Sequence, residues 1–160
     1  MRVSFFTEDA FGPQFIIRLI PILRNHGLID EDTIVGKSRA FPKCNPKLGK
    51  MVSASSLFFD RAVVLVDAEG YATDIVESKT RNHIKDKDAL AITRFVVMQY
   101  EIEEWICESE EFNLEGSKPS EILKTKLRYE KFQLPLYAER MHLERMRNCR
   151  SFQDFIRALI

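Results

Sequence analysis

The first hundred residues alternate between short apolar runs and segments with apolar residues at helical spacing. Apolar runs rich in β-branched and aromatic residues are typical of strands. Strands are therefore expected over residues 2–7, 33–41 and 62–67 and within 89–99. The run AVVLVD at 62–67 is almost continuously apolar, which is typical of a parallel strand that is buried on both faces.

Helices are expected between these strands, over residues 13–27, 46–58 and 74–84. Pro13 suits the first helical position, and Gly27 favours the end of the same helix. Asp74 and Glu77 have the spacing of a capping box for the third helix. The alternation of strands and helices indicates βαβ units and a mostly parallel sheet.

The last sixty residues are charged and have apolar residues at helical spacing. Helices are expected over 101–111, 119–128 and 135–147 and from Ser151 to the end, with Ser151 and Asp154 capping the last one. The sequence thus predicts an α/β fold with a mostly parallel central sheet of about four strands, flanked by helices. We interpret residues 1–160 as a single domain, with an α/β core (1–100) and a helical annex (101–160) packed on it.

Composition and charge exclude several classes of protein. Hydrophobic residues make up 45% of the chain and charged residues 30%, which is typical of folded globular domains. Lys plus Arg equals Asp plus Glu at 24 each, so any electrostatic signal must be local. Three cysteines without a Cys-x-x-Cys motif argue against a disulfide framework and favour the cytoplasm. No apolar stretch approaches the ~18 residues that span a bilayer, so no membrane association is expected.

Acidic residues follow two of the predicted strands. Glu8 and Asp9 come after the first strand, and Asp67 and Glu69 come at the end of the third. Ligands of open α/β sheets bind outside the carboxyl ends of the strands. Residues two apart in an extended segment point to the same side, so Asp67 and Glu69 are expected to face one ion together. Glu8 would share this site if the two strands are neighbours.

Carboxylates this close together repel one another unless a cation or a proton relieves them. Mg²⁺, or Mn²⁺, suits oxygen ligands and normally keeps several waters, so few protein ligands are needed. The alternative is that acids at strand ends solvate a loop or cap a helix. Acids at two strand ends, one set in the form Asp-x-Glu, favour the metal site.

Two further groups of residues are candidates for the same site. Glu101 and Glu103 follow the fourth predicted strand and would add a carboxylate to the metal, or else belong to a solvated helix face. Lys37 and Arg39 lie in a stretch, 33–59, whose basic residues could grip a phosphate backbone. The alternative for this stretch is a solvated basic loop and helix.

The segments FFTEDAFGP, with Glu8, and VVLVDAEG, with Asp67 and Glu69, resemble the toprim domain of topoisomerases, primases and the overcoming-lysogenization-defect nucleases. The toprim pattern is a Glu after the first strand and an Asp-x-Asp after a later hydrophobic strand. This chain departs from it at Glu69, which replaces the second Asp, and at Asp9, which replaces a Gly.

The later segments VVMQYEIEEW, KPSEIL, RYEK, LPLYAERM and CRSFQDFIRAL resemble small uncharacterised toprim-like proteins of bacteria and archaea. Together the two resemblances cover nearly the whole chain. They imply that Glu8 acts as general acid or base and that Asp67 and Glu69 hold Mg²⁺. Lys131, in the Tyr-x-Lys of RYEK, would contact substrate phosphate or, alternatively, pack on the annex.

The function that these residues favour is a metal-dependent nuclease acting on DNA or RNA. One alternative is a non-catalytic module that binds a metal or accepts a phosphoryl group at Asp67, as receiver domains do with strand-end acids. No lysine at the end of a fifth strand is evident for that role. Another alternative is a subunit of a larger defence or repair complex with a degenerate site. The sequence leaves open whether the chain has a partner protein or forms a homodimer.

Overall fold

The central sheet has four strands, all parallel, in the order β2-β1-β3-β4. A computed structural model describes residues 1–43 and 45–160, apart from the side chain of Lys37. The strands are β1 (Arg2–Thr7), β2 (Ile34–Ala40), β3 (Arg61–Asp67) and β4 (Thr93–Met98). The predicted fold class is confirmed.

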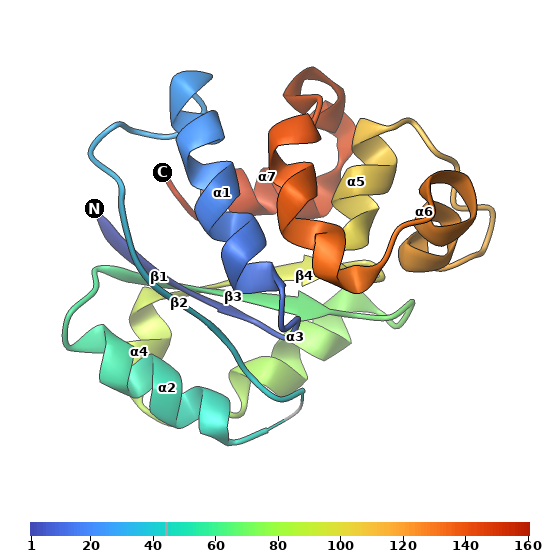
Figure 1. Cartoon of the computed structure of the whole chain (residues 1–160). Helices are drawn as coiled ribbons and strands as arrows, with labels where there is room; N and C mark the ends of the chain where they lie inside the picture. The colour runs from blue at the N-terminus through green and yellow to red at the C-terminus, as the bar shows by residue number, and fades with distance from the viewer. Residues whose placement is uncertain (44) are drawn as a thin grey trace.

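Helices cover both faces of the sheet (Figure 1). One face carries α2 (Lys47–Ser56), α3 (Thr73–Arg81) and α4 (Lys87–Ile92). The other face carries α1 and the elements of the annex. These are α1 (Gly12–Asn25), α5 (Glu103–Ser109), α6 (Pro119–Leu127), the 3-10 helices η1 (Lys131–Arg140) and η2 (Leu143–Asn148), and α7 (Arg150–Arg157).

The alternation of side chains along the strands builds two cores. Phe5 of β1 and Leu65 of β3 point to the face that carries α1 and the annex, whereas their neighbours Phe6 and Val64 point to the opposite face. Trp105 of α5 is fully buried in the first core. The annex therefore shares its core with the sheet and with α1.

The annex differs from the prediction over residues 135–147. A single helix beginning at Pro135 was expected, but this prediction is wrong. The segment forms two 3-10 helices, η1 and η2, and Pro135 lies inside the first. Proline has no N–H to donate, so it is poorly suited to a regular α-helical ladder.

Two predicted caps are also wrong. Ser151 lies inside α7, where its hydroxyl accepts a hydrogen bond from Trp105 Nε1 at 2.9 Å. Helix α3 begins at Thr73 without a side-chain cap, and Asp74 accepts a hydrogen bond only from the adjacent Ile75 N. The short helix α4 was not expected, although Asp86 caps its N-terminus through the N–H groups of residues 88 and 89.

Candidate functional site

The ends of β1 and β3 bring Glu8 and Asp67 together. The two strands are neighbours, as the shared site required, and Thr7 pairs with Leu65. Glu8 follows at the carboxyl end of β1, and its Oε2 accepts a hydrogen bond from the backbone N–H of Asp67 at 3.4 Å. The sheet therefore sets two carboxylates at the position where α/β sheets bind ligands.

Glu8 and Asp67 are both partly buried, and neither forms an ion pair with any other described residue. Burial, followed by the charge of Glu8, raises the pKa of Asp67 to about 8. Burial also raises the pKa of Glu8 above its ordinary value, against the opposing effect of Lys43. Without a bound cation, the pair therefore keeps protons that exposed carboxyl groups would release.

Glu69 does not continue the extended strand. Asp67 is the last residue of β3, and Glu69 has a φ of +51°, in the left-handed region. The backbone N–H of Glu69 donates to the carbonyl of Tyr100 at 3.0 Å, which ties this turn to the end of β4. The segment is therefore not extended at Glu69, which was the premise for expecting Asp67 and Glu69 to face one ion together.

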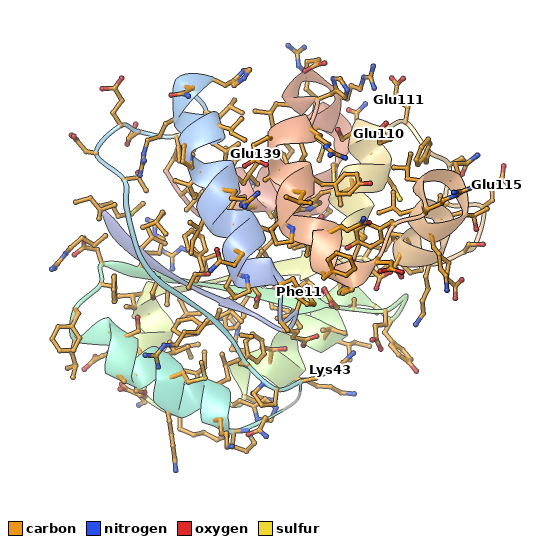
Figure 2. All side chains as sticks on the ribbon, in the orientation of Figure 1. Phe11, Lys43, Glu110, Glu111, Glu115 and Glu139 are labelled. Atoms are coloured by element: carbon orange, nitrogen blue, oxygen red, sulfur yellow. The ribbon has the colours of Figure 1, made fainter. Side chains whose placement is uncertain are left out.

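The carboxylate of Glu69 instead pairs with Lys43, whose Nζ lies 2.8 Å from its Oε2. Lys43 lies on the loop after β2 (Figure 2). Burial lowers the pKa of Lys43, but the hydrogen bond to Glu69 and the charges of Glu8 and Asp67 outweigh that effect and raise it. Lys43 is thus a cation held at the border of the acidic site.

A second lysine, Lys131, is held by two acids at the same edge. It forms ion pairs with Asp9 and with Glu103. The other carboxylate oxygen of Asp9 accepts the N–H groups of Phe11, at 2.7 Å, and Gly12, at 3.1 Å, at the start of α1. Asp9 therefore fixes both the beginning of α1 and the position of Lys131.

Glu103 is the most deeply buried acid of the site, with no exposed surface. Its Oε1 accepts a hydrogen bond from the hydroxyl of Tyr129 at 2.9 Å and contacts Lys131 Nζ at 2.5 Å. Its Oε2 has no hydrogen-bond partner among the described residues. Burial raises the pKa of Glu103 in spite of Lys131, and Glu103 in turn raises that of Asp67. The buried cluster and the Glu8–Asp67 pair are therefore electrostatically one site.

The other predicted residues lie elsewhere. Glu101 accepts the N–H of Ser120 at 2.8 Å and so stabilises the start of α6. Arg39 pairs with Phe6 in the sheet and is exposed, and it has no ion pair with a described acid. The side chain of Lys37 lies outside the described part of the structure.

The donor set fits a hard divalent cation. Glu8 and Asp67 offer only oxygen ligands and lack a cationic partner within the described residues, and Mg²⁺ retains several waters in most sites. Within residues 1–43 and 45–160, no three His, Cys, Asp or Glu side chains converge closely enough to hold a metal on their own. A bound ion would therefore rely on a few protein ligands and on water or substrate oxygens.

Sequence reasoning missed how Asp9 and Lys43 contribute to this site. Asp9 was noted as a strand-end acid, but its position three residues before Gly12, where the Gly12-Pro13 helix start lies, also favours a helix cap. Lys43 was one of several basic residues in its stretch, without a signal that singled it out. Their partners come from separate elements, so the pairings depend on the folded arrangement.

Comparisons of the chain with protein-family models, curated proteins and solved structures found no match. In the described part of the chain, no helix is both long enough and apolar enough to cross a membrane. The function of this chain is therefore inferred from the geometry and charge of this site.

Proposed function

We propose that this chain is a divalent-metal-dependent enzyme of the toprim type that acts on phosphodiesters, as a nuclease on DNA or RNA. One observation supports this above the others: Glu8 and Asp67 meet at the ends of adjacent parallel strands, and neither has an ion-pair partner among the described residues. Carboxylates in this position create a local demand for positive charge.

Asp67 would hold the cation, and Glu69 would join it as the resemblance implies. Glu69 is available for this role only if Lys43, its present ion-pair partner, turns away from it. When bound, the cation would polarise a phosphoryl oxygen and stabilise the negative charge that develops there.

Glu8 is suited to proton transfer. Its raised pKa brings its titration closer to neutral pH than that of an exposed glutamate, and general acid–base catalysis works best when the pKa lies near the working pH. In this proposal Glu8 donates a proton to the leaving oxygen or accepts one from the attacking group.

Lys43 and Lys131 would position the phosphate. Lys43 is half-exposed beside Glu69, so it can reach a substrate at the rim of the site. Lys131 is held by Asp9 and Glu103 and supplies a fixed positive charge near Asp67. Both would stabilise negative charge on a phosphodiester.

The test is nicking of supercoiled plasmid and cleavage of single-stranded RNA with Mg²⁺, Mn²⁺ or EDTA. We expect cleavage by the wild type that depends on the metal and falls at least about a hundredfold in Glu8→Gln and Asp67→Asn, the scale usual for a lost acid–base group. Glu144→Gln is the matched control, because the Glu144 side chain is 69% exposed and distant in sequence from these acids.

Circular dichroism must show that the inactive variants remain folded. Wild-type protein that cleaves neither DNA nor RNA with either metal would contradict the proposal. Equal activity of the wild type and Asp67→Asn would also contradict it.

A second candidate function is a module that accepts a phosphoryl group on Asp67. The observation that favours it is Lys131, which is held by Asp9 near Asp67, although it lies on η1 and not on a strand. Incubation with a small phosphodonor and Mg²⁺ would then add the mass of one phosphoryl group to the peptide containing Asp67. An unlabelled peptide, together with metal-dependent cleavage of nucleic acid, would exclude this candidate.

A further inference from the structure

The outer edge of β4 has no partner strand among the described residues. β4 is the last strand of the sheet, and the carbonyl of Met98 faces β3, where it accepts the N–H of Ala68 at 2.9 Å. Successive residues of a parallel strand direct their backbone groups to opposite sides. Phe95 and Val97 therefore direct their N–H and C=O groups outward, away from β3.

A groove follows this edge. Two hollows of about 530 Å³ and 750 Å³ lie along β4, and both are lined by Phe95, by Glu77 of α3 and by Arg150 and Asp154 of α7. The groove thus runs between α7, on one face of the sheet, and α3, on the other (Figure 1). β4 contributes Phe95 and Val97 to the lining, and these are the residues whose backbone groups face outward.

The two ends of the groove carry opposite charge. The end near the start of β4 is lined by Arg81, Arg94 and Arg157, and the end near its carboxyl terminus by Glu104 and Glu108. Arg81 and Arg157 form ion pairs within their own helices, with Glu77 and Asp154.

Arg94 and Glu108, by contrast, form no ion pair with any described residue. The Arg94 guanidinium donates only to the nearby carbonyls of Ala91 and Thr93. The groove therefore has an unpaired arginine towards one end, and towards the other an unpaired glutamate, Glu108, beside the hydrogen-bonded Glu104.

We propose that the β4 edge is a homodimer interface, in which β4 of a second copy pairs with it in the antiparallel direction. A two-fold axis across the strand brings the arginine end of each copy to the glutamate end of the other, so one contact surface is complementary to itself. Arg94 of each copy then faces Glu108 of the other copy.

Pairing of this kind gives the outward N–H and C=O groups of Phe95 and Val97 partners, as strand addition does at other exposed sheet edges. It also leaves Glu8 and Asp67 accessible, because they lie at the carboxyl ends of β1 and β3. The inference is independent of the proposed function.

Sedimentation velocity over a wide range of protein concentration tests the interface. We expect the wild type to sediment as a species of twice the mass of one chain and to dissociate on dilution. Val97→Lys should sediment as a monomer at every concentration, because a charged side chain in the groove opposes edge-to-edge pairing. Ile34→Lys is the matched control: it places the same charge on β2, the opposite edge strand, at a residue that is 60% exposed.

Charge reversal tests the antiparallel orientation without changing the half-buried Val97. Arg94→Glu and Glu108→Arg should each shift the protein to the monomer, and the double variant should restore the dimer.

A monomeric wild type, or a dimer that Ile34→Lys disrupts and Val97→Lys does not, would overturn the interface. A double variant that stays monomeric would overturn the antiparallel pairing. If the groove binds an extended peptide of another protein and not a second copy, the wild type should be monomeric, which overturns the homodimer.

Discussion

At the scale of single residues, the most unusual feature of this chain is the pair Glu8 and Asp67. Each is an ordinary acid at a strand end, but the parallel pairing of β1 with β3 places one beside the other. The nearby lysines are bound to other acids, Lys43 to Glu69 and Lys131 to Asp9 and Glu103. Lys131 lowers the pKa of Asp67, but burial and the neighbouring acids outweigh it, so a proton or a cation from solution must relieve the remaining charge.

In the absence of metal, stability should fall as pH rises towards 8 because of Asp67. The unfolded chain releases this proton near the ordinary value of 3.8, whereas the folded protein keeps it up to about 8. The stabilisation is therefore complete below about pH 4 and is lost as pH rises through 8. A tenfold change in proton affinity corresponds to about 1.4 kcal/mol, so the loss amounts to a few kcal/mol.

Urea denaturation in EDTA at several pH values measures this effect. Asp67→Asn has no such proton, so its free energy of unfolding should exceed that of the wild type by an amount that grows with pH up to about 8. Glu144→Gln is the control on the exposed surface. A constant difference between the wild type and Asp67→Asn across this range would contradict the assignment.

Two of the cysteines should react slowly with alkylating reagents. Burial raises the pKa of Cys149 to about 11 and that of Cys107 to about 12, and the thiolate is the reactive form. Alkylation by iodoacetamide at neutral pH, followed by peptide mass spectrometry, should therefore show little labelling of either residue in the folded protein. Labelling of Cys149 in the folded state as fast as in urea would contradict this prediction.

The sequence was sufficient to identify the acids but not their partners. Glu8 and Asp67 follow apolar runs, so their places at strand ends could be inferred from local pattern alone. The ion pair between Asp9 and Lys131 joins residues more than a hundred positions apart, and no local rule relates them. The backbone at Glu69 was expected to be extended, but the strand ends at Asp67 and the chain then turns through a left-handed residue.

At the scale of elements, Glu104 ties the end of β4 to α7. Its carboxylate accepts the N–H groups of Gln99, at 3.1 Å, and Tyr100, at 3.0 Å, and the hydroxyl of Ser151 at 2.6 Å. The same hydroxyl accepts the N–H of Trp105. One partly buried acid therefore connects the strand, the start of α5 and the first turn of α7.

Glu104→Ala should lower the free energy of unfolding by about 1–3 kcal/mol, because it leaves the partly buried donors of Tyr100 and Ser151 without this acceptor. Glu110→Ala, on the same helical segment, is the control: Glu110 is also half-buried but forms no side-chain hydrogen bond or ion pair within the described residues. Urea denaturation measures both. Equal effects of the two substitutions would show that the network does not contribute to stability.

The elements that could be predicted are those whose apolar spacing is regular over their whole length. The strands and α1, α2 and α6 were expected close to their observed bounds. The six-residue α4 is too short to show a clear period, so it was missed despite its cap at Asp86. The 3-10 helices of the annex have a different period from an α-helix, and Pro135 was therefore taken for a helix start.

At the scale of the whole molecule, the sheet and the annex are stabilised by the same side chains. The rings of Trp105 and Phe155 lie 5.1 Å apart between centroids, and those of Phe5 and Phe155 lie 5.8 Å apart. A continuous row of aromatic side chains thus joins β1, α7 and α5. The arrangement of the annex on the sheet depends on these contacts, and the sequence indicated only that such helices would follow the core.

The chain should therefore unfold in a single transition. Trp105 is the only tryptophan, so its fluorescence reports on the contact between the annex and the sheet, while far-ultraviolet circular dichroism reports on all helices and strands. The two signals should give the same midpoint in urea. An earlier transition of the fluorescence would mean that the annex separates from the sheet before the core unfolds.

If Glu8 and Asp67 form a divalent-cation site, the protein must bind a divalent cation in solution through these two residues. Titration calorimetry with Mg²⁺ and with Mn²⁺ should give saturable binding of one ion to the wild type and to Glu144→Gln. Binding should be lost in Asp67→Asn and weakened in Glu8→Gln. Saturable binding that survives in both Asp67→Asn and Glu8→Gln would contradict the assignment of these residues. A wild type that binds neither ion would contradict the metal site itself.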